Sequence, residues 1–538
     1  MKWTSTQQSV IDTRNKNILV SAAAGSGKTA VLVERIIQRI MDEKDPVDVD
    51  KILVVTFTNA AAAEMKERVR KALDKAVLAD PKNSRLRTQA TLVHTAQIRT
   101  IDSFCSYIVK NYFYEIDADP AFRIGDSGAI KLLKEQALDE ALAASFENPT
   151  EDFRLLADAY MQNKKSVETF KQLVYDINDK ASSYAWPEDW FKECKKLYGY
   201  SKDNIKESPF VKYIVERSNG IFKDLAKDLR TVLGFYAADD TSKDGAILRN
   251  ELALYEALSL ENDFEKLQEI TAGMEFDTLR LGAKGSGAPK ECVEEIKKVR
   301  DTCKTAARSV QKEYFAESLN DIAYELEFVG RQVGALLSLT EDFRLKLSEL
   351  KKKKGIFEFN DIEHMALHIL RNKDSEAHEK RAVAAELSDF FREVMVDEYQ
   401  DSNDLQEAIL TAVCTDNNYF TVGDVKQSIY AFRQASPALF NEKFHSYPDR
   451  NEAVRIDLDS NFRSRSEVLE FSNRIFYKLM QQDMGKVAYD DAAALKPGAR
   501  GFEETGFLLQ PEVLVANSNK EDLHNYGFDN ATAMEAQM

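Results

Sequence analysis

A glycine-rich segment near the start of the chain constrains the fold more than any other feature of the sequence. It follows a short apolar run at residues 17–20 and opens a helical pattern that places Val33, Ile36 and Ile40 on one face. A strand, a glycine-rich turn and a helix in this order predict a loop that binds phosphate through backbone N–H groups and the helix N-terminus. The loop consists of Ala22, Ala23, Ala24, Gly25, Ser26, Gly27, Lys28 and Thr29, with Ala22 in place of the first glycine of the usual motif.

Four further apolar runs end in turn residues and alternate with helical patterns. This alternation predicts an α/β fold with a parallel sheet covered on both faces, whose ligands bind at the carboxyl ends of the strands. Between residues 126 and 354 the strand signal fades and a helical period dominates, so we expect a large helical insertion. The further runs are at residues 51–57, 394–396, 419–422 and 453–458.

Two adjacent carboxylates, Asp397 and Glu398, follow the run at residues 394–396. We expect Asp397 to hold Mg²⁺ and Glu398 to polarise an attacking water, which is the division of labour that ATP hydrolysis needs. In the glycine-rich loop, Lys28 would reach the β- and γ-phosphates and the Thr29 hydroxyl would reach Mg²⁺. The sequence therefore predicts ATP and Mg²⁺ as cofactors.

Polar and aromatic side chains follow the run at residues 419–422. The Gln427 amide is predicted to contact the γ-phosphate and the attacking water. Tyr430 and Phe432 lie two residues apart beside Arg433 and offer a stacking platform for a base. An aromatic pair beside a strand end also fits ordinary core packing.

The end of the run at residues 51–57 has a similar character. Phe57 could stack on a base, and Thr58 and Asn59 could contact a nucleic-acid backbone. The alternative is an ordinary amphipathic helix that begins there. Arg463, after the run at residues 453–458, could stabilise charge on a transferring phosphoryl group, or it could be a surface arginine.

Charge and composition narrow the class of protein. The 538 residues carry a net charge of −17, but residues 1–125 hold 19 basic and 15 acidic side chains, so bulk acidity does not exclude nucleic acid. The five cysteines are scattered without C-x-x-C pairs, which argues against a disulfide scaffold and a zinc site. No apolar run approaches the roughly 18–20 residues of a membrane span, and the first residues lack a signal-peptide core. We therefore expect a cytoplasmic protein that does not enter a membrane.

These motifs, in this order, resemble those of superfamily 1 DNA helicases of the UvrD/RecB type. Within that superfamily they are most similar to the AddA (RexA) group of helicase–nuclease subunits, through residues 20–25, 100–105, 119–124 and 489–498. The resemblance implies that Gln7 reads adenine, that Phe462 stacks on adenine and that Arg463 is an arginine finger. It also implies that Phe57, Tyr430 and Phe432 stack on DNA bases while two RecA-like domains close on ATP.

The resemblance also predicts the domain organisation. Residues 1–125 and 355–448 would form the first RecA-like ATP-binding domain, residues 126–354 its helical insertion, and residues 449–538 an incomplete second RecA-like domain. The later helicase motifs and the nuclease domain of the family are not found before Met538. We therefore expect the chain to correspond to the N-terminal part of such a protein.

The resulting hypothesis is an ATP-dependent 3′–5′ DNA helicase that acts on single-stranded and duplex-end DNA within a helicase–nuclease. It would form a heterodimer with an AddB (RexB)-type partner and process double-strand ends for recombinational repair. One alternative is a fragment that binds ATP and single-stranded DNA with little turnover, because the second half of the ATP site is missing. Another is a stand-alone UvrD-like repair helicase, which would need neither a partner nor a nuclease.

Overall fold

The protein is organised as two compact units. The computed structural model describes residues 3–162, 164–480, 489–491, 493–499 and 502. Unit 1 consists of Met1–Asp126, Ser182–Trp186 and Gly355–Met538. Unit 2 consists of Ser127–Ala181 and Pro187–Lys354.

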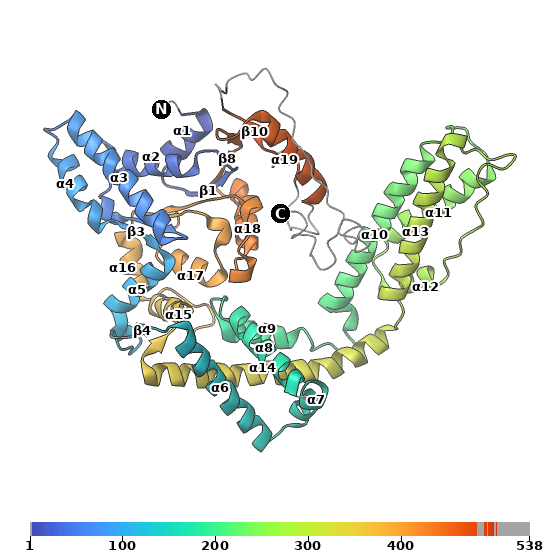
Figure 1. The fold of residues 1–538 in the computed structure, drawn as a ribbon, viewed down its shortest axis with the longest axis horizontal. Coiled ribbons are helices and arrows are strands. Elements are labelled where there is room, and N and C mark those ends of the chain that lie inside the picture. Colours follow the sequence, from blue (N-terminus) through green and yellow to red (C-terminus); the bar gives the residue numbers. More distant parts are fainter. Residues whose placement is uncertain (1–2, 163, 481–488, 492, 500–501, 503–538) are drawn as a thin grey trace, which may run out of the picture. The chain divides into compact units, whose positions relative to one another are not determined.

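A six-stranded sheet forms the centre of unit 1 (Figure 1). The strand order is β3–β2–β6–β7–β1–β8, and all neighbouring strands are parallel. The α/β fold with a parallel sheet, predicted from the alternation of strands and helices, is thus confirmed. The strands are β1 (Asn17–Ala22), β2 (Ile52–Thr56), β3 (Gln97–Thr100), β6 (Glu393–Val396), β7 (Tyr419–Gly423) and β8 (Ala453–Leu458).

Helices cover both faces of this sheet because the strands are apolar on both sides. Leu19 packs in one hydrophobic cluster, whereas its neighbours Ile18 and Val20 pack in the other. The cluster around Ile18 and Val20 includes side chains from α1 (Ser5–Asp12), α2 (Lys28–Met41), α3 (Asn59–Ala79) and α4 (Ser84–Leu92). The other includes side chains from α5 (Ile101–Tyr112), α15 (Phe359–Leu370), α16 (Ala382–Phe390), α17 (Asp404–Ala412) and α18 (Pro437–Ser446).

The structure corrects two domain boundaries. Residues 453–458, expected in a second RecA-like domain over 449–538, form the sixth strand of the first sheet instead. They pair with β1 from Asn17↔Ala453 to Ala22↔Leu458, because an apolar β1 buries best between two neighbours. Much of the rest of 449–538 lies outside the described residues; α19 (Ser466–Leu479) and the short strands β9 (Ser460–Asn461) and β10 (Lys496–Pro497) are described.

The second correction concerns Ser182–Trp186, which was expected inside the insertion and belongs to unit 1. The Ser182 carbonyl accepts a hydrogen bond from Asn360 Nδ2 at 2.9 Å. Trp186 stacks on His378 with ring centroids 3.6 Å apart. Flanking the insertion, β4 (Arg123–Ile124) pairs in parallel with β5 (Ile356–Phe357).

Unit 2 is helical wherever it shows regular structure in the described residues. One core gathers around Phe222 and Tyr255, and a second around Phe170 and Phe343. The helices are α6 (Ser127–Glu147), α7 (Glu151–Tyr160), α8 (Lys164–Ala181), α9 (Pro187–Lys196), α10 (Pro209–Leu233), α11 (Lys243–Leu260), α12 (Phe264–Ala272), α13 (Val293–Tyr314) and α14 (Leu319–Lys354).

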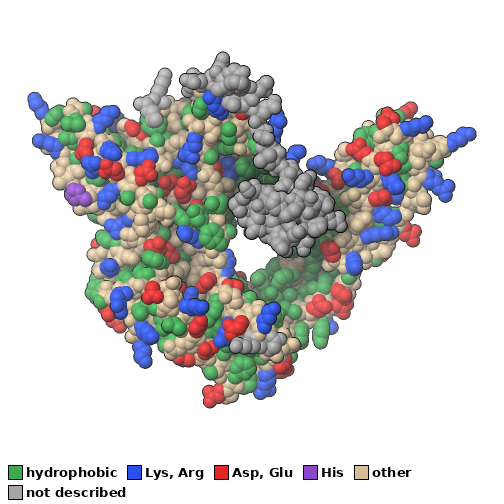
Figure 2. All heavy atoms as spheres, viewed as in Figure 1, with side chains coloured by type: hydrophobic (Ala, Val, Ile, Leu, Met, Phe, Trp, Pro, Cys, Tyr) green, Lys and Arg blue, Asp and Glu red, His purple; other side chains and the backbone are tan. Residues whose placement is uncertain are grey.

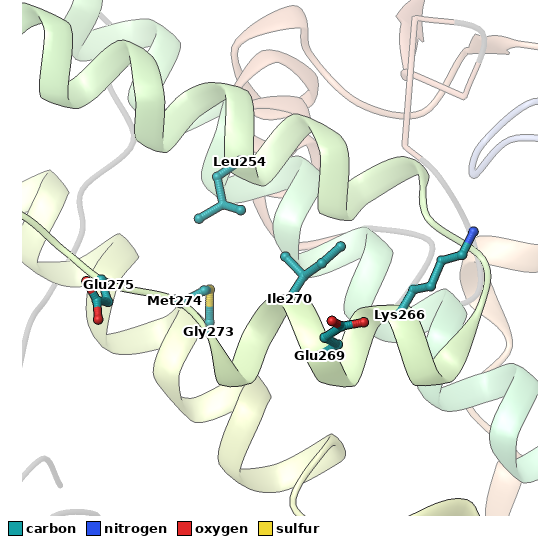
Figure 3. A pocket seen from close by; sticks show the side chains of 7 residues that line it. All are labelled: Leu254, Lys266, Glu269, Ile270, Gly273, Met274 and Glu275. Atoms are coloured by element: carbon teal, nitrogen blue, oxygen red, sulfur yellow. The ribbon is translucent and has the colours of Figure 1, made fainter.

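Unit 2 also holds an open pocket beside α11 and α12 (Figure 3). Leu254, Ile270 and Met274 give it an apolar lining, and Lys266 and Glu269 add charged groups. None of these side chains belongs to the sites predicted from the sequence.

The surface carries charges of both signs. On the face shown in Figure 2, basic and acidic side chains are interspersed over the protein. The net charge of −17 is therefore not gathered into one acidic patch on that face. Among the described helices, none is both long and apolar enough to cross a membrane.

Candidate nucleotide and DNA site

The glycine-rich loop connects β1 to α2 at the carboxyl edge of the sheet. Gly25 and Gly27 have φ values of +70° and +84°, a left-handed backbone that glycine adopts without strain. Ala22, which replaces the first glycine of the motif, is still part of β1, so its Cβ is accommodated there. The buried Ser26 hydroxyl has no hydrogen-bond partner among the described residues, which suits a loop built around an oxygen-rich ligand. Lys28 is the first residue of α2.

The two predicted carboxylates follow β6 directly. Glu398 accepts an ion-paired hydrogen bond from Lys28, with Nζ 2.9 Å from Oε2. Burial and the neighbouring charge of Glu398 raise the pKa of Asp397 to about 6, although Lys28 acts in the opposite direction. Glu398 itself has a left-handed backbone with φ 52°, and its N–H donates to Asp397 Oδ1 at 3.0 Å. The turn thus directs both carboxylates from one strand end.

Two residues to which the sequence analysis gave no role connect this turn to Gln427. Gln400 donates from Nε2 to Glu398 Oε2 at 3.0 Å and accepts the Asp424 N–H at 2.9 Å. Asp424 in turn accepts from Gln427 Nε2 at 2.8 Å. Gly423 makes this approach possible, because a Cβ there would lie 2.2 Å from the Gln400 side-chain oxygen. Gln400 and Asp424 could have been predicted as site residues, because both follow closely after the carboxyl end of a strand.

Gln7 lies against the glycine-rich loop. Its Nε2 donates to the Ser26 carbonyl at 3.0 Å, and its Oε1 accepts the Thr4 N–H at 3.1 Å in the capping box of α1. A side-chain amide has two N–H groups and two acceptor positions, so each of its atoms retains one further hydrogen-bonding position. The predicted hydrogen bonds from Gln7 to adenine would use this remaining N–H group and this remaining acceptor position.

Phe462 and Arg463 lie beside the same loop, although they come from the far end of the sequence. The Phe462 N–H donates to the Gly25 carbonyl at 2.9 Å, and the side chain is 40% exposed. A Cβ on Gly25 would come within 2.9 Å of Arg463 Cβ. Arg463 was expected from a second domain, but its segment belongs to unit 1, together with the loop.

The predicted DNA-stacking residues form one cluster. Phe57 and Tyr430 have ring centroids 4.8 Å apart, and Tyr430 and Phe432 have centroids 5.6 Å apart. The Arg433 guanidinium lies over all three rings at 5.3–5.8 Å from their centroids. Because Phe432 is 74% exposed, its ring is not core packing.

Thr58 and Asn59 begin α3 beside this cluster. Thr58 is the N-cap, and its hydroxyl accepts the N–H of Ala61 at 3.1 Å. Asn59 is the first residue of the helix, and both side chains are exposed. This placement fits the alternative of an ordinary helix that begins with an N-cap. It also leaves both side chains accessible to a nucleic-acid backbone.

Comparison with known proteins matches the chain to one family. Residues 3–448 match the model of the UvrD/REP helicase N-terminal domain. The chain is 38% identical over 533 residues to an ATP-dependent helicase/nuclease subunit from Lachnoclostridium phytofermentans, covering 97% of this chain and 38% of the relative. It is 36% identical over 552 residues to the protein of the same name from Anoxybacillus flavithermus, covering 100% of this chain and 45% of the relative.

The protein of that name from Oceanobacillus iheyensis is 36% identical over 539 residues, covering 97% of this chain and 43% of the relative. The chain thus spans about two fifths of the length of the curated relatives it matches. The resemblance inferred from the motifs is confirmed by these matches. The chain belongs to the UvrD/REP helicase family, as an α/β RecA-like helicase domain with a helical insertion.

Proposed function

We propose that this chain is the ATP-hydrolysing and DNA-gripping part of a helicase–nuclease. The observation that carries the proposal is the convergence of Lys28, Glu398 and Gln427 at the carboxyl ends of three neighbouring strands. A hydrogen-bonded path from Lys28 through Glu398, Gln400 and Asp424 to Gln427 joins them. A phosphate-binding lysine, a carboxylate base and a γ-phosphate-contacting amide are the groups that ATP hydrolysis requires.

Each group has a definite task in this proposal. Lys28 exchanges its contact with Glu398 for the phosphates of ATP, which frees Glu398 to accept a proton from the attacking water. Gln427 orients that water, and Arg463 stabilises charge on the γ-phosphate. Asp397 and the Thr29 hydroxyl would hold Mg²⁺, which would neutralise charge on the phosphates.

The aromatic cluster supplies the grip on DNA. Exposed rings beside an arginine stack on bases without regard to sequence, as a translocating enzyme needs. The polarity is proposed to be 3′–5′, on single-stranded DNA reached from duplex ends. The relatives carry the name of one subunit of a helicase/nuclease, which supports a partner for this chain. The proposed partner is of the AddB (RexB) type, and the proposed role is recombinational repair of double-strand ends.

The first test is ATP turnover by the purified chain with and without single-stranded DNA. We expect turnover that DNA stimulates and that Lys28→Ala abolishes, while the exposed control Lys44→Ala behaves as wild type. Nucleotide and DNA binding without turnover would favour the alternative of a binding fragment. If the chain neither binds nor hydrolyses ATP, the proposal is overturned.

The partner is tested separately. An AddB-type protein should co-purify with the chain or with its full-length counterpart. Unwinding by a preparation that retains no second protein would favour the alternative of a stand-alone UvrD-like repair helicase.

A further inference from the structure

Three successive carbonyl groups of the glycine-rich loop accept hydrogen bonds from residues outside the loop. The Ala24 carbonyl accepts from Asn461 Nδ2 at 2.7 Å, and the Gly25 carbonyl accepts the Phe462 N–H at 2.9 Å. The Ser26 carbonyl accepts from Gln7 Nε2 at 3.0 Å. The donors come from segments more than 450 residues apart in the sequence and meet at one loop.

These contacts fix the direction of the loop amides. In a trans peptide the C=O group and the following N–H point in opposite directions. Holding the three carbonyls outward therefore turns the N–H groups of Gly25, Ser26 and Gly27 inward, where a phosphate would bind. The Ser26 N–H closes a turn onto the Ala23 carbonyl at 3.1 Å, so Gly25 and Gly27 offer the remaining two.

Asn461 makes more of these contacts than the other two donors, because its side chain bonds the loop and two further main-chain N–H groups. While Nδ2 donates to Ala24, Oδ1 accepts the N–H groups of Arg463 and Ser464, each at 2.8 Å. The side chain is buried, since the residue is only 2% exposed. Its own carbonyl accepts the Gly498 N–H at 2.8 Å, which anchors the backbone around it.

This geometry explains why asparagine occupies the position. A carboxylate of the same shape could accept the two N–H groups but could not donate to the Ala24 carbonyl. A leucine could do neither, and a serine hydroxyl is too short to span both segments. Gly25 is matched to it, because a Cβ on Gly25 would lie 2.8 Å from Asn461 Nδ2.

We propose that Asn461 is a positioning residue that holds the glycine-rich loop in its phosphate-accepting form and couples it to the main chain of Arg463 and Ser464. The inference rests on the proposed function, because it concerns the same nucleotide site. Through this single amide, the loop that receives the phosphates and the segment that carries the proposed arginine finger keep a fixed register. Asn461 itself touches no reacting atom.

The test is calorimetric titration of the chain with MgADP and, separately, with magnesium pyrophosphate. We expect Asn461→Asp to weaken both ligands by the same factor, about tenfold, since a lost buried hydrogen bond costs roughly 1.4 kcal/mol. The two factors should agree because the loop holds only the phosphates. A merely structural role would instead lower the unfolding temperature without nucleotide and leave the affinities of the folded protein unchanged.

Asn418→Asp is the matched control. Asn418 is 9% exposed, donates to the Phe391 carbonyl at 2.9 Å and accepts the Thr415 N–H at 2.8 Å, at the opposite end of β7. The Asn418→Asp variant therefore loses the same kind of hydrogen bond at a position away from the loop. Its affinities for MgADP and magnesium pyrophosphate should stay within about twofold of wild type. If Asn461→Asp does not fold, Asn461→Ser takes its place in the same titrations.

The outcomes separate this inference from the proposed function. Wild-type binding that Lys28→Ala abolishes but Asn461→Asp leaves intact would overturn the role of Asn461 and leave the function standing. Failure of the wild-type chain to bind either ligand would overturn both. Equal weakening of both ligands by Asn461→Asp and by the uncharged Asn461→Ser, with Asn418→Asp unaffected, would establish the positioning role, because a new carboxylate beside the loop by itself repels phosphate.

Discussion

The ammonium of Lys28 lies 2.9 Å from Oε2 of Glu398, so the proposed phosphate-binding lysine and the proposed base neutralise each other. This pair is only partly buried: the Lys28 side chain is 12% exposed and that of Glu398 39% exposed. Both groups therefore have room to separate when phosphates compete for the lysine. In the proposed mechanism, the pair keeps Glu398 occupied until a nucleotide replaces it at Lys28.

Replacing Glu398 with glutamine should separate binding from chemistry. Glu398→Gln removes the competitor for Lys28, so MgATP should bind at least as tightly as to wild type. Turnover should fall by about 100-fold or more, because a positioned base contributes that much to the rate. Titration and single-turnover hydrolysis measure the two effects, with the exposed Glu43→Gln as control. Unchanged turnover would rule out Glu398 as the base.

The aromatic cluster should dominate affinity for single-stranded DNA. Phe432→Ala removes a 74%-exposed ring and should weaken binding by roughly 1–3 kcal/mol, the range for one stacked base. Fluorescence anisotropy with an oligothymidine probe measures this affinity. Phe390→Ala removes a ring that is 42% exposed at the end of α16 and should have no effect. Equal effects of the two variants would contradict a stacking site at Phe432.

A buried ion network between β6 and α2 should contribute to stability. Glu393 begins β6, accepts from Arg35 Nε at 2.7 Å and lies 3.3 Å from Arg39 Nε. Both arginines are on α2, the helix that follows the glycine-rich loop. Glu393→Gln would leave the buried Arg35 guanidinium without a carboxylate, and Arg39 with only the exposed Asp45, whose Oδ2 lies 3.6 Å from its Nη2. This should lower the free energy of unfolding by about 3 kcal/mol.

Urea unfolding followed by circular dichroism checks this value. The control is Glu64→Gln, which breaks the exposed pair with Arg68 on α3 and should change stability by less than about 1 kcal/mol. A Glu393→Gln variant as stable as this control would show that the buried network contributes little.

Glu363 should make stability depend on pH. Burial, together with the charge of Asp102, raises the pKa of Glu363 to about 8, although a 3.0 Å hydrogen bond from Gln406 opposes the shift. A glutamate in the unfolded chain has a pKa near 4.3, so the folded state binds the extra proton between about pH 4.5 and 8. The contribution of this group to stability is therefore lost as the pH rises through that window.

Glu363→Gln removes the titrating proton and should make the free energy of unfolding less dependent on pH. Between pH 5.5 and 8.5, the free energy of unfolding should fall by roughly 1–4 kcal/mol more for wild type than for the variant. Urea unfolding at several pH values gives the difference directly. Parallel curves for the two proteins would show that Glu363 does not titrate in this range.

The sequence by itself determined the strands and the chemistry at their ends. Short apolar runs are local signals, and the run at residues 17–20 with its glycines predicts a strand followed by a glycine-rich loop without information from distant residues. Asp397 and Glu398 were recognisable for the same reason, because a strand end and two adjacent carboxylates are visible in a few residues. The strand β3 (Gln97–Thr100) was missed, since only Ile98 among its four residues is strongly apolar.

Only the tertiary structure decided which distant segments share one site. The pairing of Ala453–Leu458 with β1 places Asn461 against Ala24, 437 residues earlier in the chain, and moves Arg463 into unit 1. Arg433 likewise finds Phe57 only because β2 and β7 end at the same edge of the sheet. Local patterns specify which element each segment forms. Strand order and side-chain contacts depend on burial of the whole core, to which every segment contributes together.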